Sequence, residues 1–511
     1  MKVAEPVTPR NGAVPADWFA AADLGATSGR VIAGRLEAGR FELDEVARFD
    51  NRPIQAEDGL HWDFDDLIGQ VRRGLKAADE ASGHQLASVG IDTWGVDYGR
   101  LDAAGDLLEQ PFHYRDRRTE ATPAEVFTRL PSEQLYARAG LQVMDFNTIF
   151  QFVAQAGDPD WPRVARTLLM PDLLAYRLTG QPVAEVTIAS TTGLLDVAAR
   201  QWSGPTCAFL ADQYGLPLPR MLPRLVEPGT VIGPIAPDLM GRPVGFVAVA
   251  EHDTASAVVA VPSLTPNFAF ISSGTWSLVG LELDEPVLSP ASLAASFTNE
   301  LGLDHTVRYL KNVMGLWVLN ECVSQWQAGG LASDLAWLLD QAAGRPGLEY
   351  VIDMDDASLM PAGDMIGRVR ALAAATGQGL DPDPVAMTRC IVDSLALAYR
   401  HAIQTACALT GRRVEAVHIV GGGSRNGLLC QLTAEATGLP VVAGPAEGTA
   451  LGNLLVQARA MGALSGGLTD LRRVAVASSD LTTYQPGVLD LPAARWAEAS
   501  RRIKPDAGRQ P

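Results

Sequence analysis

The hydrophobic pattern of the first half of the chain alternates between strand-like and helix-like periods. Residues 18–36 consist of an apolar strand, a turn of Gly, Ser and Thr, and a second strand, which is typical of a β-hairpin. Between residues 64 and 82, apolar side chains recur at helical spacing, and Asp63 stands where a helix cap is expected. The same patterns predict strands at 86–92, 96–101 and 244–250, and helices at 168–180 and 252–260.

The second half repeats this theme, beginning with a distorted copy of the opening hairpin at residues 267–283. Gly274 of this copy aligns with Gly25 of the first. A long helix is predicted over 386–409, and a buried strand over 415–420 is followed by three glycines. The remaining predicted elements are a helix that follows these glycines as far as Thr437, a strand at 440–443 and a helix at 447–464. Strands that alternate with helices predict α/β lobes with largely parallel sheets.

A boundary between two lobes is predicted at residues 261–266, where VPSLTP interrupts both periodicities. A chain of 511 residues is also too long for one ordinary core. The expected domains are a disordered tail at 1–15, a first lobe at 16–262, a second lobe at 267–487 and a C-terminal helix and tail at 488–511. Because both lobes open with a small-residue hairpin, we expect two related lobes that clamp one nucleotide between them.

The composition excludes some classes of function without identifying one. The chain is 47% hydrophobic and 20% charged, which is a globular profile, and its formal net charge of −18 argues against a nucleic-acid partner. The first residues lack the apolar core of a secretory signal, and no apolar run reaches the roughly 18 residues of a membrane helix. Five scattered cysteines without a CxxC pair predict reduced thiols in a cytosolic enzyme.

Asp23 and the turn that follows it have two interpretations. The structural interpretation is a hairpin with an Asx-type turn, in which Arg30 is a solvated residue at the start of a strand. The functional interpretation gives Asp23 a metal-bound water and gives the turn at 26–30 the phosphates of a nucleotide. In that case Arg30 neutralises phosphate charge.

His252-Asp253-Thr254 lies where a predicted strand ends and a helix begins. Asp253 is either the N-cap of this helix or a general base aimed into a site. The two roles are compatible, because ligands favour the carboxyl ends of parallel strands.

Two glycine-containing turns are further candidates. Gly95 lies in a turn between two strands, where it either forms a bulge or lets a small ligand approach the backbone. The three glycines at 421–423 exceed what a tight strand-to-helix turn needs, which favours the approach of a planar ligand such as a nucleotide base. His61 and His113 follow no metal pattern, and the chain has neither a Ser-His-Asp signature nor a dinucleotide fingerprint.

Together these segments resemble carbohydrate kinases of the FGGY family, and the resemblance covers nearly everything from residue 19 to 486. HDTASAV, KNVMGLW and the TWGVD turn are similar to the branch of the family that acts on L-rhamnulose, whereas DLGATSGR alone indicates any sugar kinase or actin-like ATPase. The matching segments are DLGATSGR (23–30), GIDTWGVDY (90–98), YRDRRT (114–119), MPDLLAYRLTG (170–180), STTGLLD (190–196), HDTASAV (252–258), SSGTWSL (272–278), KNVMGLW (311–317), HIVGGGSRN (418–426) and AGPAEGTALGN (443–453).

The resemblance implies two ribonuclease H-like lobes of the actin and hexokinase type with an interlobe cleft. It implies ATP- and Mg²⁺-dependent phosphorylation of the 1-hydroxyl of L-rhamnulose, a step of L-rhamnose catabolism, with Asp253 as the base. Its implied sites are Gly95, His252, Asp253 and Thr254 for the sugar, Ala26, Thr27, Ser28, Gly29, Arg30, Thr275, Asn312, Asn320 and Gly422 for the nucleotide, and Asp23 for the metal. Asn320 departs from the family, because relatives carry a Gln there, so the nucleotide contact at this position is lost, bridged by water or replaced.

Several alternatives stay open at this stage. The chain could be an FGGY kinase for another ketose or polyol, such as L-fuculose or D-xylulose, or a sugar-binding regulator that has lost catalysis. An actin-like or chaperone ATPase uses the same kind of clamp, although the second lobe is followed by no recognisable peptide-binding domain. The sequence leaves the oligomeric state undetermined, with a monomer compatible, and makes Trp94 a candidate for stacking against the sugar.

Overall fold

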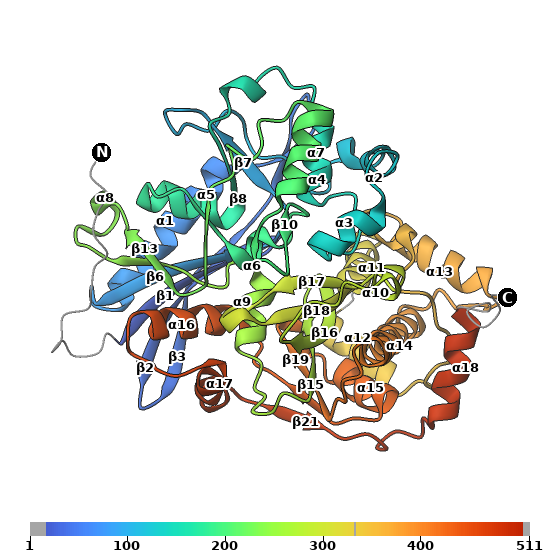
Figure 1. The fold of residues 1–511 in the computed structure, drawn as a ribbon. Coiled ribbons are helices and arrows are strands. Elements are labelled where there is room, and N and C mark those ends of the chain that lie inside the picture. The colour runs from blue at the N-terminus through green and yellow to red at the C-terminus, as the bar shows by residue number, and fades with distance from the viewer. Residues whose placement is uncertain (1–16, 332–333, 504–511) are drawn as a thin grey trace. The chain divides into compact units, whose positions relative to one another are not determined.

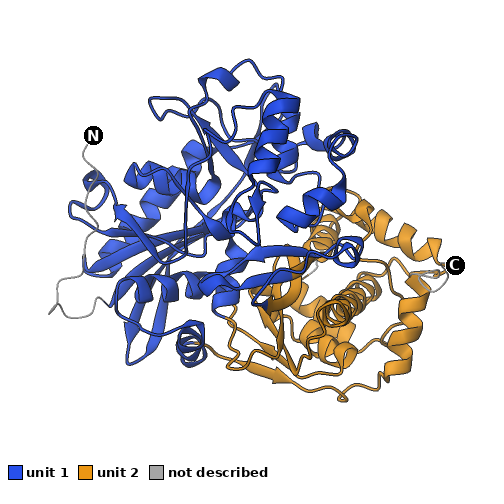
Figure 2. Ribbon diagram, viewed as in Figure 1, with its two compact units in different colours: residues 1–260, 283–309, 448–478 blue, residues 261–282, 310–447, 479–511 orange. Residues whose placement is uncertain are grey.

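The computed structural model describes residues 17–331 and 334–503, so the tail expected at 1–15 lies outside the described residues. The chain divides into two compact units (Figure 2). The first unit comprises residues 1–260, 283–309 and 448–478, and the second comprises 261–282, 310–447 and 479–511. Two segments that fall within the range expected for the second lobe, 283–309 and 448–478, are therefore packed with the first unit.

The first unit is built on a six-stranded sheet in the order β13-β14-β6-β1-β2-β3. Strand β1 pairs antiparallel with β2 to form the predicted opening hairpin, and it pairs parallel with β6. Every residue of β1 from Phe19 to Leu24 is buried, as expected for a strand covered on both faces. The six strands are β1 (Trp18–Leu24), β2 (Ser28–Glu37), β3 (Arg40–Asp50), β6 (Leu86–Thr93), β13 (Thr230–Pro234) and β14 (Gly245–Ala248).

Helices cover both faces of this sheet. Ala20, Ala22 and Leu24 belong to the core that also contains α1 (Phe64–Ala81), whereas Phe19 and Ala21 belong to the core that contains α9 (Asp253–Val259) and α16 (Gly448–Ala460). Alternate residues of one strand thus serve two cores. In Figure 1, α16 in red lies beside β1 in blue, so segments that are far apart in the sequence pack together in this unit.

The second unit repeats the central part of this arrangement. Its strands β16-β15-β19-β20-β21 follow in that order, with β15 and β16 antiparallel, β15, β19 and β20 parallel, and β21 antiparallel to β20. This is the pattern of β2-β1-β6-β14-β13 in the first unit. The strands are β15 (Phe268–Ser273), β16 (Trp276–Leu283), β19 (Ala416–Val420), β20 (Val441–Ala443) and β21 (Thr482–Tyr484).

The predicted helix ends depend on local caps that the structure confirms. The side chain of Asp63 accepts a hydrogen bond from Asp66 N at 3.0 Å at the start of α1. Gly411 ends the long helix α14 (Pro384–Thr410) in the left-handed conformation, with φ of 68°. The last described helix, α18 (Ala493–Ile503), lies in the segment for which a C-terminal helix is expected.

The remaining elements are smaller. Strands β17 (Thr298–Leu301) and β18 (Val307–Met314) belong to the second sheet, whose full order is β17-β18-β16-β15-β19-β20-β21. Outside the two main sheets the strands are β4 (Pro53–Gln55), β5 (Leu60–Trp62), β7 (Tyr98–Leu101), β8 (Arg166–Leu169), β9 (Val183–Glu185), β10 (Leu195–Asp196), β11 (Gln201–Trp202) and β12 (Arg224–Val226). The further helices are α2 (Thr122–Phe127), α3 (Ser132–Ala139), α4 (Thr148–Ala154), α5 (Met170–Thr179), α6 (Val186–Ala189), α7 (Gly204–Tyr214), α8 (Pro237–Met240), α10 (Pro290–Ala294), α11 (Trp317–Ala328), α12 (Leu335–Ala343), α13 (Met365–Ala375), α15 (Gly427–Thr437) and α17 (Leu468–Ala477).

Two element predictions need correction. The helix expected at 168–180 begins only at Met170, because Arg166–Leu169 forms strand β8 and pairs with β7. The N-cap of α9 is His252, so the interpretation of Asp253 as the N-cap is wrong, and Asp253 is the first residue of the helix. The apolar pattern at 166–169 is compatible with either state, and pairing with β7 decides in favour of a strand. His252 has the extended backbone of an N-cap, with φ of -77° and ψ of 123°.

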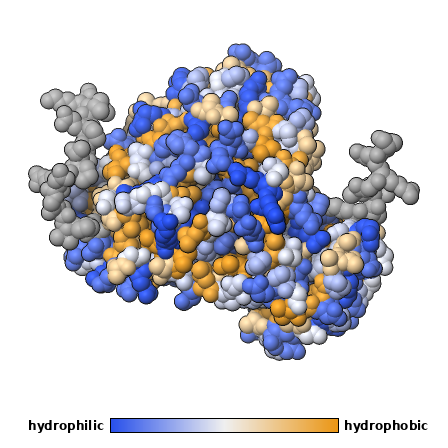
Figure 3. Space-filling model, turned by 60° about the horizontal axis from the view of Figure 1, so that its bottom comes forward, coloured by the Kyte–Doolittle hydropathy of each residue, from blue (hydrophilic) through white to orange (hydrophobic). Residues whose placement is uncertain are grey.

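The surface is of mixed polarity. On the face shown in Figure 3, small hydrophobic areas are interspersed with hydrophilic residues. Among the described residues, no helix is both long and apolar enough to cross a membrane.

Candidate functional site

Asp23 lies at the end of β1, directly opposite Arg30 on β2. The Arg30 guanidinium donates to Asp23 Oδ2 from Nη2 at 2.7 Å and from Nε at 3.0 Å. Both side chains are largely buried, with exposures of 20% for Arg30 and 9% for Asp23. Arg30 is therefore neither a solvated edge residue nor an unpaired cation in this conformation, because its charge is directed at Asp23.

The turn between these strands is held by backbone hydrogen bonds and by one asparagine. Gly25 N donates to Ser28 O at 2.9 Å, Asn51 N donates to Thr27 O at 3.0 Å, and Asn51 Nδ2 donates to Gly25 O at 3.0 Å. The carbonyl groups at positions 25, 27 and 28 thus have protein partners. These bonds hold the backbone at 25–28, which overlaps the segment 26–30 that is expected to contact phosphates.

His252, Asp253 and Thr254 begin helix α9, next to the carboxyl end of β6. Thr93 pairs in parallel with His252, and Thr93 N donates to Glu251 O at 2.9 Å. Asp253 Oδ1 accepts from Thr254 N at 2.5 Å and from Thr254 Oγ1 at 3.1 Å. His252 Nε2 lies 3.4 Å from the same oxygen. One carboxylate oxygen of Asp253 is thereby held in place by its two neighbours.

Three carboxylates of the first unit influence one another. Burial, together with the nearby Asp23, raises the pKa of Asp253, against the opposing effect of His252. Burial and Asp23 also raise the pKa of Asp92 well above its usual value, against a hydrogen bond that Asn453 Nδ2 donates to Asp92 Oδ2 at 2.6 Å. The structure thus brings Asp23, Asp92 and Asp253 together as a cluster of negative charge, with Arg30 as a cation at its side.

Gly95 follows β6 and packs against Thr191. A Cβ atom at position 95 would lie 3.0 Å from Thr191 Oγ1 and 3.1 Å from its methyl carbon, and Thr191 Oγ1 accepts from Val96 N at 3.1 Å. The positive φ of this turn belongs to Val96, at 71°, and not to Gly95. Gly95 is needed here for its small size, and the strained residue is the one after it.

Trp94 is part of a buried aromatic cluster around Asp97. Asp97 Oδ2 accepts from Trp62 Nε1 at 2.7 Å and from Trp94 Nε1 at 3.0 Å, and Gln151 donates to Oδ1 at 3.0 Å. The rings of Trp62 and Trp94 have centroids 4.1 Å apart. Burial raises the pKa of Asp97 to about 6 although these hydrogen bonds oppose it. The indole N–H of Trp94 is therefore committed to Asp97.

The residues expected to contact the nucleotide in the second unit surround the β15–β16 turn. Thr275 lies in that turn, and its carbonyl accepts from Trp317 N at 3.2 Å. A Cβ atom at Gly315 would lie 2.6 Å from Thr275 O, so only glycine fits there. Gly422 opens a 3₁₀ turn after β19, and its neighbour Gly423 would bring a Cβ atom within 2.0 Å of Ser273 Oγ.

Asn312 and Asn320 belong to two further elements of the second unit. Asn312 lies on β18, three residues before the glycine that packs on the Thr275 turn. Asn320 lies in the first turns of α11, where its backbone N–H donates to Leu316 O at 2.9 Å. The segment 312–320 therefore runs from the β15–β16 turn into helix α11, and the helix fixes the backbone of Asn320.

The sequence reasoning missed several buried polar residues near Asp253. Glu185, Glu251 and Asp172 are all buried in the first unit, and Glu185 Oε2 accepts from Glu251 N at 3.1 Å. Burial raises the pKa of Glu185 to about 7. Glu300 and Arg308, which contact His252, were missed as well. An acidic residue among apolar neighbours is the sequence signal at Asp172 of α5, at Glu185 of β9 and at Glu251 before α9.

His61, His113 and the cysteines were also considered as candidate ligands. His61 and His113 are buried, and His113 stacks on Trp62 with ring centroids 4.0 Å apart, which confirms a core role for it. All five cysteines are free thiols. Within residues 17–331 and 334–503, no three His, Cys, Asp or Glu side chains are grouped so that they could hold a metal ion by themselves.

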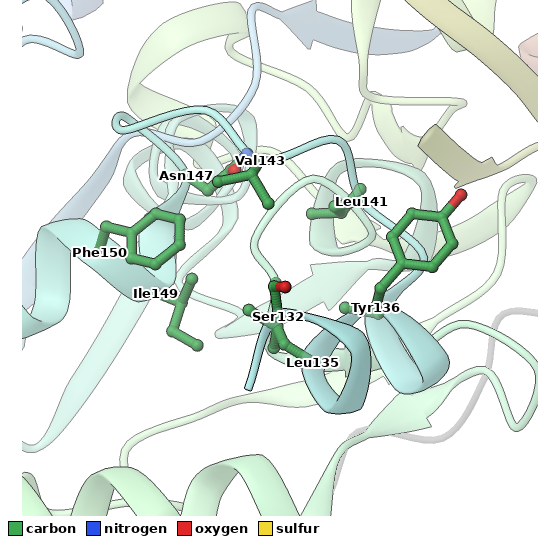
Figure 4. A pocket seen from close by; sticks show the side chains of 10 residues that line it. Ser132, Leu135, Tyr136, Leu141, Val143, Asn147, Ile149 and Phe150 are labelled. Atoms are coloured by element: carbon green, nitrogen blue, oxygen red, sulfur yellow. The ribbon is translucent and has the colours of Figure 1, made fainter. Parts of the chain in front are cut away.

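A small pocket of the first unit is separate from these residues. Figure 4 shows it between Ser132, Leu135 and Tyr136 of α3 and Asn147, Ile149 and Phe150 at α4. Its lining is mainly apolar, and none of the predicted site residues contributes to it. The pocket is thus a packing feature of the α3–α4 region.

The fold and its repeated hairpins define the class of the protein. Two units that share one strand pattern, each opening with a β-hairpin of small residues, form a two-lobe α/β fold of the actin and hexokinase type. Solved structures agree on this fold. Gluconate kinase from Lactobacillus acidophilus matches with a TM-score of 0.77 at 16% identity, covering 95% of this chain and 96% of that one. Plasmodium falciparum glycerol kinase with ADP matches with a TM-score of 0.75 at 14% identity, covering 95% and 98%.

Sequence comparisons identify the family. Residues 19–260 match the N-terminal domain, and residues 269–461 the C-terminal domain, of the FGGY family of carbohydrate kinases. A rhamnulokinase from Bacteroides thetaiotaomicron is 40% identical over 92% of this chain and 96% of its own, and one from Pectobacterium carotovorum is 39% identical over 95% and 96%. The chain belongs to the FGGY family and is a carbohydrate kinase.

Proposed function

We propose that this kinase uses ATP to phosphorylate the 1-hydroxyl of L-rhamnulose, a step of L-rhamnose catabolism. The observation that carries this proposal is the similarity to curated rhamnulokinases, which extends at 37–40% identity over 87–96% of the chain. The same similarity makes this substrate preferable to another ketose or polyol such as L-fuculose or D-xylulose. The gluconate, xylulose and glycerol kinases support only the fold.

Asp253 is the residue that we assign to the chemistry. Thr254 and His252 contact its Oδ1, so we assign Oδ2 to the proton of the attacking hydroxyl group. Burial raises its pKa, which makes its carboxylate a stronger base than that of an ordinary aspartate. Phosphoryl transfer depends mainly on positioning and on charge neutralisation, and a carboxylate held by two neighbours provides the positioning.

Sugar recognition is assigned to residues around this carboxylate. His252 and Thr254 fix Asp253, and Gly95 lies in the turn that follows Thr93, the partner of His252. A Cβ atom at position 95 would crowd Thr191 at 3.0–3.2 Å, and the absence of a side chain at Gly95 favours a close approach of the sugar to the backbone. Trp94 contributes through the aromatic cluster on Asp97, since its indole N–H is already bound there.

Phosphate binding is assigned to the opening hairpin. We propose that the amides of Ala26, Thr27, Ser28 and Gly29 receive the phosphates of ATP and that Arg30 balances part of their charge. Because Arg30 is hydrogen-bonded to Asp23, it can contact a phosphate only while keeping this ion pair or after breaking it. In the second unit, Thr275, Asn312 and Gly422 are assigned to the nucleotide, with Asn320 the weakest member because it replaces a Gln of the family.

Mg²⁺ fits a site with few protein ligands. This ion prefers oxygen ligands and is usually held by one or two carboxylates together with substrate phosphates and water. Asp23, beside Asp92 and Asp253, offers such carboxylate oxygens. When bound, the ion would offset negative charge on the phosphates of ATP.

We also propose a cytoplasmic location, which suits an enzyme with five free thiols.

The experiment that tests this function measures ADP release from Mg·ATP with L-rhamnulose, L-fuculose, L-ribulose, D-xylulose, glycerol and no sugar. A strong preference for L-rhamnulose, with the product phosphorylated at the 1-position by NMR, is expected. Preference for another acceptor would overturn the substrate and keep the kinase. ADP release that is independent of every sugar would favour an ATPase that drives conformational change.

A further inference from the structure

Two strands from the second half of the sequence supply charged residues to the first unit. Glu300 lies on β17 and Arg308 lies on β18, and both belong to the segment 283–309 of that unit. Arg308 is fully buried, and its Nε donates to Leu301 O at 3.1 Å. Leu301 N donates to Ser190 Oγ at 3.0 Å. The two strands are thereby anchored, and their charged side chains have fixed positions.

Both residues contact the imidazole ring of His252. Glu300 Oε2 lies 3.0 Å from His252 Nδ1 and 2.9 Å from Arg308 Nη1, and Arg308 Nη1 lies 3.2 Å from the same ring nitrogen. The other ring nitrogen, Nε2, lies 3.4 Å from Asp253 Oδ1. The imidazole therefore links the Glu300–Arg308 pair to the carboxylate that is assigned as the base.

The Glu300–Arg308 pair is buried, so water screens its charges only weakly. The exposures of the side chains are 0% for Arg308, 7% for Glu300 and 9% for His252. Removing charges from water costs several kcal/mol each, so burying this pair next to a reactive site requires compensation within the pair. Burial alone would raise the pKa of Glu300, but Arg308 and His252 lower it, so Glu300 is ionised.

We propose that Glu300 is a positioning residue for the phosphoryl transfer, which orients His252 against Asp253 and cancels the charge of Arg308 beside the base. This inference rests on the proposed function of Asp253. Without Glu300, the Arg308 guanidinium, which donates to His252 Nδ1, loses the carboxylate that pairs with it, and its positive charge acts on Asp253 without compensation. Without Arg308, the negative charge of Glu300 is left beside Asp253 instead.

Loss of the charge of Glu300 and loss of the charge of Arg308 are expected to shift the pH dependence of the reaction in opposite directions. Asp253 must be ionised to accept a proton, so activity falls as the pH falls through the pKa of Asp253. Glu300→Gln leaves an uncompensated cation, which favours the carboxylate and moves this acid limb to lower pH. Arg308→Met leaves an uncompensated anion and moves the limb to higher pH. Other charged groups that act on Asp253 or on Arg308 are Asp23, Asp92 and Glu185, while Arg30 acts on Asp92, and both variants leave these groups unchanged.

The test measures kcat and KM against pH for the wild type, Glu300→Gln, Arg308→Met and the double variant. Glu300→Gln is expected to lower kcat about tenfold with an unchanged KM for ATP, because the base is weakened and misoriented. The acid limbs of the two single variants should shift in opposite directions, and that of the double variant should return toward the wild type. Equal or absent shifts in a folded, active enzyme would overturn the proposal.

Two control variants separate positioning from stability. Glu435→Gln replaces another buried glutamate, in the second unit, which accepts from the backbone N–H groups of Gly487, Val488 and Leu489. It should lower the melting temperature and leave the acid limb in place. Glu300→Asp keeps the charge but shortens the reach, so kcat should fall without a shift of the limb. If Arg308→Met fails to fold, Glu300→Gln and Glu300→Asp still decide the question.

A spectroscopic measurement keeps this inference distinct from the proposed function. The chain has seven histidines, so imidazole ¹⁵N spectra of labelled enzyme can be assigned by comparison with His252→Gln. Glu300→Gln should shift both ring nitrogens of His252, whereas Glu435→Gln should leave them unchanged. An unshifted His252 would overturn the inference even if L-rhamnulose is the substrate. A shifted His252 in an enzyme that phosphorylates no sugar would reject the proposed function and retain the contact between Glu300 and the ring.

Discussion

In the opening hairpin, Gly25 N donates to Ser28 O at 2.9 Å, whereas in the second hairpin Gly274 N donates to Trp276 O at 2.8 Å. The second turn is therefore one residue shorter, and the register of its strands differs. Asp23 faces Arg30 across the first hairpin, and the corresponding Ser272 faces Leu278 across the second. The same backbone frame thus carries an ion pair in one unit and uncharged side chains in the other.

The segments that follow the neighbouring parallel strand differ in the same way. Strand β6 ends at Asp92 and Thr93 and leads to Asp97, whereas β19 leads to Gly421, Gly422 and Gly423. One unit places carboxylates beside its hairpin, and the other lets the backbone approach closely, since a Cβ atom at Gly423 would overlap Ser273. The repeat therefore conserves the sheet and differs in its side chains, with buried carboxylates beside the hairpin in the first unit and close backbone packing in the second.

Asp253→Asn should have the largest effect, because it removes the proposed base from the charged unit. We expect kcat to fall by about 10³-fold or more, with the fold and the affinity for ATP retained. Turnover with L-rhamnulose and calorimetric ATP binding measure the two properties separately. Asp238→Asn, which changes an exposed aspartate of the same unit, is the matched control. Near-normal turnover of Asp253→Asn would remove this residue from its assigned role.

The stability of the first unit should depend on pH through Asp97. Burial raises its pKa from 3.8 to about 6, so between these values the folded chain binds a proton that the unfolded chain releases. The unfolding free energy should therefore fall as the pH rises from about 4 to 6, by about 3 kcal/mol at most, and then stay level. Urea unfolding of the wild type and Asp97→Asn across this range measures the difference. Equal pH dependence in both proteins would contradict the prediction.

Gly423→Ala tests the close packing that distinguishes the second unit. The new Cβ atom would lie 2.0 Å from Ser273 Oγ and 2.4 Å from Ser273 Cβ, so the turn must shift at a cost of about 1–3 kcal/mol. We expect a lower melting temperature and weaker binding of ADP. Adding Ser273→Gly should restore both, whereas adding Ser273→Ala should not, because the Cβ overlap remains. Equal rescue by the two second substitutions would reject the steric account.

Local sequence signals predicted the frame of both units but not the contacts of the site. The hairpins, the Asp63 cap and the glycine that ends α14 follow from residues adjacent in sequence, and the structure confirms them. The contacts around Asp92 and His252 do not. Asn453 reaches Asp92 from 361 positions away, and Arg308 reaches His252 from 56 positions away. Periodicity shows which face of an element is buried, but not which distant side chain shares that burial.

The smallest effect is expected for substitution of Arg30, which tests the role of the charged turn. Arg30→Ala leaves the carboxylate of Asp23 without its cation beside Asp92 and Asp253, whose pKa values Asp23 already raises. The acid limb of kcat should move to higher pH, with a loss of activity of about tenfold or less at pH 6. Arg35→Ala, on the same strand, removes a guanidinium that contacts the exposed Glu37 and the ring of Trp18, and it should leave the limb unchanged.

Arg30→Lys then separates charge from geometry at the same position. Lysine keeps the positive charge, but it cannot reproduce the two nitrogen contacts of the guanidinium with Asp23 Oδ2. If charge alone sets the pKa of the neighbouring carboxylates, Arg30→Lys should restore the acid limb and leave the KM for ATP raised. A limb that stays shifted in Arg30→Lys would show that the paired geometry is required. An unshifted limb in Arg30→Ala would instead mean that this ion pair does not control the base, and the contrast between the two hairpins would then concern phosphate binding alone.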